Sequence, residues 1–504
     1  MLYLNALVEG LTAVLSWPAF GLMLLGVGIG VVVTMVPGLG GVFAFSVMLP
    51  FTFAMTPIQA FAFLLGMHAV TTVNDEIWSV LFAVPSEANA TATILDGHPL
   101  AKQGHAGRAI GAHLFSSLIG GIFGAALLAA AIPLVRPFVL SFGNPELFML
   151  VVLGLTFVAS LSGRRIMPGM IVAGLGLVLS MVGQDPITSQ LRFTFGQLFL
   201  QEGPPLVSVV LGLFAVPAVI ELSVRRTSIA TAKVDLGDDL MEGVKDAFRH
   251  WKLVLVSSGI GALLGMIPGL GGSVSQWVAY GWARDHSKNK AQFGKGAIEG
   301  VLAPAAATNS KEGGHLLPTI VFGVPAGASM ALLLGAFLIV GLVPGPKMLT
   351  DHLDITFAMV WILVLAHIVS VVVCLVFLRQ LVAITHVRAT VLIPFILSFI
   401  FIGSYVGKND MGGVAVTVVF GAIGYLLVLL DWPRPPLVLG FILGHLAENY
   451  LWLSQQTFGL AWLERPLVIT LMVIIAGYLV YVASQRRNNR IVALRLELAE
   501  ATAG

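Results

Sequence analysis

Long apolar runs separated by short polar loops make up most of the chain. Many of these runs reach roughly 18 residues or more, the length at which an α-helix crosses the hydrocarbon core of a bilayer. Proline and glycine interrupt several runs, which membrane helices tolerate where neighbouring protein satisfies the backbone. The pattern predicts an all-α, polytopic integral membrane protein with roughly eleven to thirteen spans, plus broken or hairpin segments.

Composition narrows the class further. Of the 504 residues, 57% are hydrophobic and 10% are charged, whereas soluble domains carry about a quarter charged residues. The mean hydropathy is +0.95. A formal net charge of +2 is too small to indicate nucleic acid as a partner. The single cysteine, Cys374, excludes disulfides within the chain and metal–thiolate sites. We expect no cofactor.

The charges of the polar loops predict the side of the membrane that each faces, because cytoplasmic loops are enriched in lysine and arginine. The loops expected in the cytoplasm are Asp96–Arg108, Gly163–Ile166, Arg225–Lys252, Arg284–Lys295, Arg379–Arg388 and Arg486–Arg490. The loops expected on the outer side are Pro50–Pro57, Arg136–Glu146, Gln184–Pro204, Val343–Asp354 and Gly403–Gly412. We therefore expect a multi-pass protein of a bacterial cytoplasmic (inner) membrane.

The two halves of the chain are related. Residues 28–41 and 259–272 share Gly-Ile-Gly, four residues, and then Met-(Val/Ile)-Pro-Gly-Leu-Gly-Gly in the same register. The sequence Leu-Phe-Ala-Val-Pro at 81–85 likewise resembles Val-Phe-Gly-Val-Pro at 321–325. This duplication predicts an N-terminal interfacial segment (1–16), a first membrane repeat (17–224), a cytoplasmic inter-repeat loop (225–252), a second repeat (253–484) and a cytoplasmic tail (485–504).

Loops that follow equivalent motifs differ in charge, which favours repeats of inverted topology. The loop at 50–57 is uncharged, whereas its counterpart at 284–295 is basic. Because the inter-repeat loop and the tail both look cytoplasmic, inversion requires one extra crossing in the second copy, which we place at Leu437–Leu453. A transporter built this way is expected to move its paired breaks against a scaffold, as an elevator.

Both Pro-Gly-Leu-Gly-Gly segments should interrupt a helix, since proline removes an amide donor and glycine permits a tight reversal. A helix that ends in the membrane offers amides to an anion or carbonyls to a cation. We expect ion-binding residues at Pro37, Gly38, Leu39, Pro268, Gly269, Leu270, Ser273, Ser86 and Asn89, with Ser275 and Ser329 nearby. We expect substrate contacts at Gly40, Gly41, Gly271 and Gly272. Alternatively, these glycines only allow close helix packing.

A second, more polar break is expected in each half, at Thr71–Glu76 followed by Pro85–Thr93, and at Thr308–His315 followed by Pro325–Ser329. The side chains expected to contact substrate are Thr72, Asn74, Asn309, Ser310 and Lys311. Ionisable groups inside a membrane normally face a cavity, so Asp75, Glu76 and Glu312 are expected to line a pathway. Lys311 either offsets Asp75 or Glu76 or receives a substrate carboxylate. In the alternative interpretation these clusters lie at an interface and are hydrated.

Other motifs carry less chemistry. His445 and Glu448 have metal-ligand spacing on a helix, but no third ligand is evident, so structural hydrogen bonding is favoured. His68, His113 and His367 are interpreted as satisfied interior or interfacial residues. No catalytic triad or phosphate-binding loop is present in the sequence, which argues against an enzyme or ATPase and favours an ion gradient as the energy source.

Several further motifs resemble one family. They are the residues from Leu95 to Ala109, Phe142 to Phe148, Phe193 to Gly196, Gly341 to Pro346 and Pro436 to Gly444, in addition to both Pro-Gly-Leu-Gly-Gly segments. With these, the chain resembles the large membrane subunit of the tripartite tricarboxylate transporters, the TctA family. The resemblance implies secondary transport of di- or tricarboxylates driven by sodium or protons. It also implies a small four-helix membrane subunit and a periplasmic solute-binding protein as partners. Homodimerisation stays open.

The chain departs from this family where substrate should bind. Amide and small residues are usual near Thr308–Glu312, and an uncharged stretch is usual near Asn74–Ser79. Pro325-Ala326-Gly327 also replaces a Pro-Gly-Thr/Ser sequence. These departures favour a non-citrate acid, aromatic or amine-bearing, as an alternative substrate. A channel or sensor is the rival class, and an intramembrane enzyme using Asp75, Glu76 or His445 is a third option.

Overall fold

The structure is a computed structural model that describes residues 1–34, 36, 39–83, 90–161, 166–185, 187–225, 239–268, 271–384, 389–406 and 409–480. Six of the predicted ion-binding residues lie outside these ranges: Pro37, Gly38, Ser86, Asn89, Gly269 and Leu270. The side chains of Gly271, Gly272 and Ser273 are likewise not described.

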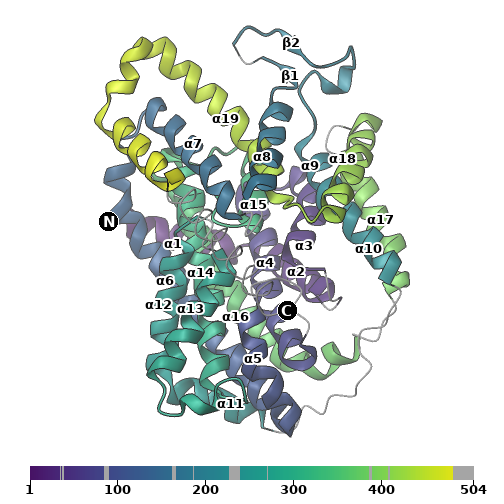
Figure 1. Cartoon of the computed structure of the whole chain (residues 1–504), viewed down its shortest axis with the longest axis vertical. Coiled ribbons are helices and arrows are strands. Elements are labelled where there is room, and N and C mark those ends of the chain that lie inside the picture. Colours follow the sequence, from purple (N-terminus) through teal and green to yellow (C-terminus); the bar gives the residue numbers. More distant parts are fainter. Residues whose placement is uncertain are drawn as a thin grey trace, which may run out of the picture.

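Helices account for nearly all of the described chain, as Figure 1 shows. In the first half they are α1 (Leu2–Leu15), α2 (Ala19–Thr34), α3 (Gly41–Met48), α4 (Pro57–Phe82), α5 (Thr91–Leu100), α6 (Ala106–Val139), α7 (Asn144–Leu161), α8 (Ile166–Ser180), α9 (Leu206–Val210) and α10 (Val216–Arg225). A short antiparallel hairpin of β1 (Gly183–Gln184) and β2 (Leu191–Arg192) follows α8. The π-helical turn η5 (Leu211–Ala215) joins α9 to α10.

The second half has the same character. Its helices are α11 (Leu240–Arg249), α12 (Trp251–Gly265), α13 (Gly271–His286), α14 (Glu299–Phe322), α15 (Ala328–Ile339), α16 (Leu353–Ile384), α17 (Ala389–Val406), α18 (Met411–Leu429) and α19 (Pro435–Phe458). The predicted all-α, polytopic membrane fold is confirmed.

Long apolar helices supply the membrane spans. Within the described ranges, five helices are long and apolar enough to cross a bilayer, or six if α1 and α2, bent by 66°, form one span. Shorter apolar helices, including α8, α12 and α15, add to these. Large apolar side chains such as Val376, Phe395 and Val418 are more than 60% exposed on the outer helices, as expected of surfaces that face lipid.

The helix breaks fall at Pro-Gly-rich sequence, in part where predicted. α2 ends at Thr34 and α3 begins at Gly41, and α12 ends at Gly265 while α13 begins at Gly271. Both Pro-Gly-Leu-Gly-Gly segments therefore interrupt a helix. The other pair of breaks follows Phe82 and Phe322, next to the two Val-Pro sequences.

The more polar pair of predicted breaks is correct at the Val-Pro sequences, between α4 and α5 and between α14 and α15. It is wrong at Thr71–Glu76 and Thr308–His315, because both clusters lie inside continuous helices, α4 and α14. Thr71–Glu76 contains no proline or glycine that would end a helix. Gly313 and Gly314 in α14 have a packing role instead. A Cβ at Gly313 would lie 2.1 Å from the carbonyl oxygen of Gly124 in α6, and one at Gly314 would lie 2.2 Å from that of Ala262 in α12.

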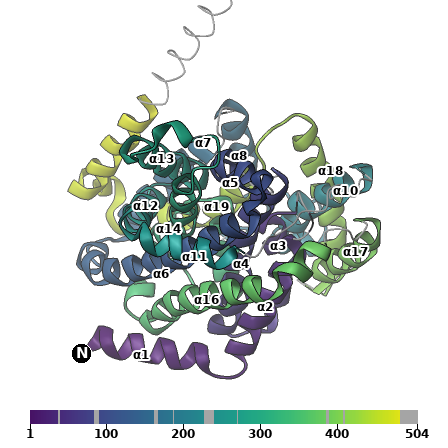
Figure 2. The ribbon, with the colours of Figure 1, turned by 90° about the horizontal axis from the view of Figure 1, so that it is seen from below.

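The two halves exchange contacts. α4 packs against α2 and α16, whereas α14 packs against α12 and α6. α1 lies along α16 (Figure 2), and α11 lies along α6 in the corresponding way. α3 of the first half contacts α15 of the second, and α13 contacts α5. Each half therefore completes the core of the other.

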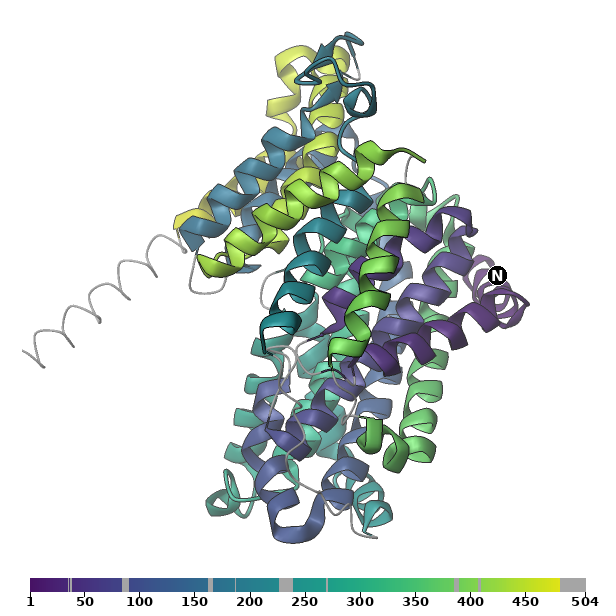
Figure 3. The same cartoon turned by 90° about the vertical axis from the view of Figure 1, so that its right-hand side faces the viewer.

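Polar segments of the two expected sides lie at opposite ends of the molecule. Figures 1 and 3 place the β1–β2 hairpin at one end, and α5 and α11 at the other. Gln103 Nε2 donates to the carbonyl of Lys295, which brings two of the loops expected in the cytoplasm together.

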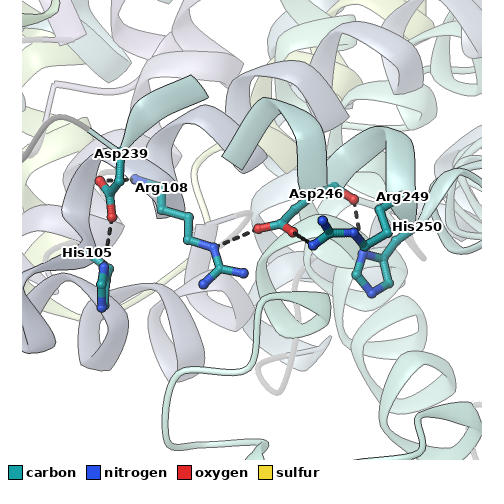
Figure 4. Close-up of polar contacts among 6 residues, drawn as sticks. All are labelled: His105, Arg108, Asp239, Asp246, Arg249 and His250. Carbon is teal, nitrogen blue, oxygen red and sulfur yellow. Dashed lines mark hydrogen bonds and ion pairs between the residues drawn. The ribbon is translucent and has the colours of Figure 1, made fainter. Parts of the chain in front are cut away.

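The predicted inter-repeat loop is partly helical. Residues 226–238 lie outside the described ranges, but α11 forms from Leu240 and α12 begins at Trp251. Figure 4 shows how this segment is fixed to the start of α6. Asp246, buried in α11, accepts from Arg108 Nε at 2.7 Å and from Arg249 Nη1 at 3.1 Å. Asp239 accepts from the Arg108 amide at 2.9 Å and lies 2.8 Å from His105 Nδ1.

Candidate functional site

Buried ionisable side chains are concentrated near the middle of α4 and α14. His68 of α4 and Glu312 of α14 form an ion-pair contact, with 2.7 Å between Nε2 and Oε2. Lys311 Nζ lies 3.6 Å from the other carboxylate oxygen of Glu312. All three side chains are buried. We name these residues, with His315 one turn further along α14, the central cluster.

His315 connects the central cluster to a helix break. Its ring lies against Gly327, where an added Cβ would be 3.4 Å from ring carbon Cε1. Gly327 is the N-cap residue of α15, so the ring faces the start of that helix. His315 is also close enough to Glu312, Lys311 and His68 to interact with them electrostatically, so the four side chains form one cluster. From α3, the ring of Phe45 contacts His68 edge-on at 5.5 Å.

Glu76 belongs to a second buried pair. His113 Nδ1 of α6 lies 3.0 Å from Glu76 Oε2. The Thr93 hydroxyl, near the start of α5, donates to the same oxygen at 2.9 Å. The other nitrogen of His113, Nε2, lies 3.0 Å from the carbonyl oxygen of Val73. This pair therefore joins three helices, α4, α5 and α6, two turns away from His68.

The predicted substrate-contact residues do not share one surface. The Asn74 amide donates to Thr34 Oγ1 at 3.0 Å in α2 and accepts from Cys374 Sγ at 2.9 Å in α16. Ser310 donates to the carbonyl of Ser258 in α12. Thr72 and Asn309 bond to carbonyls of their own helices, those of His68 and Ala305. Lys311 alone of this set lies beside Glu312 in the central cluster.

Thr72 nevertheless lies on the helix face of α4 that carries His68. His68, Thr72 and Asp75 follow the i, i+4, i+7 spacing of one helical face. These three keep 5–9% of their surface exposed, whereas Asn74 and Glu76 keep 1% or less. The face with His68, Thr72 and Asp75 is therefore the more open one, and Asn74 and Glu76 point into helix contacts.

The predicted glycine-rich tips border the clusters through the helices that follow them. Leu39 is buried and Gly40 is the N-cap of α3, which supplies Phe45 to the central cluster. Pro268 precedes α13, whose Gln276 accepts from the Ala92 amide at the start of α5. Ser275, next to Gln276, is fully buried, and Ser329 lies in the first turn of α15.

The partners of His68, His113 and Asp96 could not be predicted from the sequence. Nothing in the spacing of His68 or His113 indicates a partner that lies 244 or 37 residues away. In the sequence, Asp96 stands in a family motif and at the start of a loop expected in the cytoplasm. Its Oδ1 accepts four backbone amides, from Gly294 to Ala297, and its Oδ2 accepts the Tyr280 hydroxyl. This carboxylate fixes α5 of one half to the loop before α14 of the other.

The His445–Glu448 motif has a structural partner. Both oxygens of Glu448 accept from the Arg192 guanidinium in β2, at 2.8 and 3.0 Å. This hydrogen bond is the main reason that the pKa of Arg192 is raised. Asp185 also contacts Arg192, and its pKa is lowered chiefly by amide donation from Thr188 and Ile187. Hydrogen bonding rather than metal binding accounts for Glu448.

Buried charge paired between helices, beside helix breaks, in an all-α membrane fold is typical of a membrane transport protein. Comparison with known protein families specifies the family of transport protein. The family model of the tripartite tricarboxylate transporter TctA family matches residues 20–439. The chain belongs to this family, which is a transporter family, and is one of its membrane components.

Two relatives come from Agrobacterium vitis. An uncharacterised 52.8 kDa protein in the TAR-I ttuC′ 3′ region is 32% identical over 426 residues, which cover 84% of this chain and 85% of that protein. An uncharacterised protein in the TAR-II ttuC′ 3′ region is 34% identical over 191 residues, covering 38% of this chain and 79% of that protein. No solved structure matches the chain.

Proposed function

We propose that the chain is the large membrane subunit of a binding-protein-dependent secondary transporter that imports small organic anions across the bacterial inner membrane. A small membrane subunit and a periplasmic solute-binding protein are its partners, and a sodium or proton gradient drives uptake. Membership of the TctA family supports the class of partner and substrate.

The central cluster is the observation that carries this proposal. Ionisable groups inside a bilayer are costly, about 2.5–3.5 kcal/mol each on insertion scales, and normally mark a transport pathway. Lys311 offers positive charge beside Glu312, and His315 offers an N–H donor beside the start of α15. A helix N-terminus favours a negatively charged group, so a substrate carboxylate is attracted from two directions.

The exchanged contacts of the two halves support alternating access by an elevator-type motion of two inverted repeats. α3 and α13 each follow a Pro-Gly-Leu-Gly-Gly break and each contacts a broken helix of the other half. Breaks paired in this way can move as a unit against the surrounding helices.

Uptake by proteoliposomes tests the proposed function. The chain is reconstituted with its small subunit and binding protein, and labelled citrate, succinate, glutamate and benzoate are tested under a sodium or a proton gradient. Saturable uptake of any one acid supports the proposal, and the preferred acid distinguishes a tricarboxylate from an amine-bearing or aromatic substrate. If none of the four acids is taken up under either gradient, the proposed function is contradicted.

Lys311→Ala tests the central cluster directly. We expect the KM for uptake to rise by about tenfold or more per folded transporter, because a buried cation that pairs with substrate is removed. Lys347→Ala is the matched control, since Lys347 is exposed in the short 3₁₀ helix Pro346–Leu349. If Lys311→Ala lowers the yield of folded protein and uptake equally, Lys311 has only a structural role.

A further inference from the structure

The two buried Glu–His pairs differ in how their hydrogens can be arranged. A neutral histidine has one N–H donor and one nitrogen lone pair, whereas a protonated histidine has two donors. In the Glu76–His113 pair both ring nitrogens face acceptor atoms: the carbonyl of Val73 and the carboxylate of Glu76. The carbonyl requires a proton on Nε2, and Nδ1 lies 3.0 Å from Glu76 Oε2 and 3.5 Å from the Ser117 hydroxyl. Both ring nitrogens of His113 are therefore occupied, which restricts the uptake of a further proton.

The His68–Glu312 pair has no such restriction. Lys311 lies beside Glu312 and favours the carboxylate form, which accepts from His68 Nε2–H at 2.7 Å. The other ring nitrogen, Nδ1, is buried and has no hydrogen-bond partner among the described residues. In the neutral ring this nitrogen carries a lone pair. His68 can thus gain or lose a proton at Nδ1 without breaking its contact with Glu312.

Exposure and the surrounding charges also favour His68 over His113 as the ring that takes up a proton. His68 keeps 6% of its surface exposed, whereas His113 is fully buried. The charged and titratable groups around His68 are Glu312, Lys311 and His315 on α14 and His367 on α16, and Asp75 lies two turns further along α4. With neutral His68, the charges of Lys311 and Glu312 cancel. A proton on Nδ1 gives the three side chains a net charge of +1.

We propose that His68 is the binding site of the coupling ion and that this ion is a proton. The inference rests on the proposed transport function and specifies its coupling. A proton from water on one side forms the N–H bond at Nδ1, and the resulting imidazolium is held by the Glu312 carboxylate. The net charge of +1 then favours an anionic substrate group at the cluster, so that proton and substrate bind together. On the other side the proton returns from Nδ1 to water.

His68→Gln is the decisive variant, because the glutamine amide can still donate to Glu312 but cannot accept a proton. His113→Gln is the matched control, since it also replaces a buried histidine bonded to a glutamate. The complex is reconstituted with a pH-sensitive dye inside the liposomes, and uptake of whichever of the four labelled acids it transports is measured under an imposed proton gradient. Exchange of that acid at equal concentrations, without a gradient, is measured in parallel.

Wild type is expected to acidify the liposome interior as substrate enters. In His68→Gln, proton-driven uptake and substrate-dependent acidification should fall on the order of tenfold or more. Exchange of the acid at equal concentrations should be retained. His113→Gln should retain proton-driven uptake and substrate-dependent acidification, measured per folded transporter. Substrate-dependent acidification that persists in His68→Gln, or wild-type uptake driven by sodium without acidification, would overturn the proton site while leaving the transport function intact.

A titration that needs no transport tests proton binding separately. In the full chain with ¹⁵N-labelled histidine, the His68 signals are assigned by their loss in His68→Gln. We expect Nδ1 to change from a lone-pair nitrogen to a protonated one as the pH falls, while Nε2 stays protonated. A ring that keeps one protonation state throughout would overturn the proposal. Absence of uptake of any acid by wild type would instead contradict the proposed function, and this titration would still decide the proton site.

Discussion

Two buried glutamate–histidine pairs each have one member on α4, but their histidines differ in how many ring nitrogens have partners. Glu76 and His113 join α4 to α6, with Thr93 of α5 donating to the same carboxylate. His68 and Glu312 join α4 to α14, with Lys311 as a third charge. The first pair uses both ring nitrogens in contacts with neighbouring helices, whereas the second leaves one nitrogen without a partner.

The difference teaches that burial and pairing alone do not identify a functional ionisable group. Glu76 and Glu312 are both buried carboxylates next to a histidine, and neither could be ranked above the other from that fact. What separates the two pairs is the histidine: both ring nitrogens of His113 lie beside partner atoms, whereas Nδ1 of His68 has no partner among the described residues. A histidine with both nitrogens occupied stabilises a helix contact, and one with a nitrogen left over can bind a proton.

The largest loss of stability is expected for Glu312→Gln. Lys311 would then be a buried cation without its carboxylate, and breaking a buried ion pair in this way costs about 3–5 kcal/mol. Unfolding in mixed detergent and denaturant measures the change. The double variant Glu312→Gln/Lys311→Met should recover most of it, because no lone charge remains. A double variant as unstable as the single one would show that Lys311 does not depend on Glu312.

Glu76 should respond differently to the same chemical change. Glu76→Gln is expected to cost only about 1 kcal/mol, because a glutamine amide can donate to the neutral His113 ring and no cation is left uncompensated. Glu76→Ala should cost about 3 kcal/mol, since it removes the carboxylate beside His113 Nδ1 and the Thr93 hydroxyl and opens a cavity. The same unfolding measurement applies. Equal losses for the two variants would mean that the Glu76 contact is not a hydrogen bond to His113.

Thr93→Val removes one hydroxyl from the Glu76 contact while keeping the shape of the side chain. We expect a loss of about 1 kcal/mol, the usual contribution of one buried hydrogen bond. Thr71→Val is the control, because the Thr71 hydroxyl donates only to the His68 carbonyl of its own helix. A larger effect at Thr71 than at Thr93 would contradict the assignment of Thr93 to the pair.

The smallest effect on stability is expected for His68→Gln, which keeps an N–H donor facing Glu312. The free energy of unfolding should fall by no more than about 0.5 kcal/mol, within the range of a single exchanged hydrogen bond. Measured by the same unfolding assay, this variant separates stability from coupling. A large loss of stability would place His68 with the structural pair and make its transport phenotype uninformative.

Local sequence predicted some helix breaks correctly and misplaced others. The two Pro-Gly-Leu-Gly-Gly segments interrupt helices because proline and glycine act on the backbone within one turn. The polar clusters at Thr71–Glu76 and Thr308–His315 were expected to do the same, but polarity by itself does not end a helix. In α14 even Gly313 and Gly314 are kept helical by close contact with α6 and α12.

The sequence by itself determined the membrane class, the family and the segments in which the buried charges lie. Hydropathy, the repeated motifs and the presence of Asp75, Glu76, Lys311 and Glu312 in apolar surroundings are properties of short stretches of chain. A partner 244 residues away is not such a property. Only the tertiary structure brought His68 to Glu312 and His113 to Glu76, because helix contacts between distant segments decide which hydrogen-bonding positions are filled. Those contacts also decide which nitrogen is left to bind a proton.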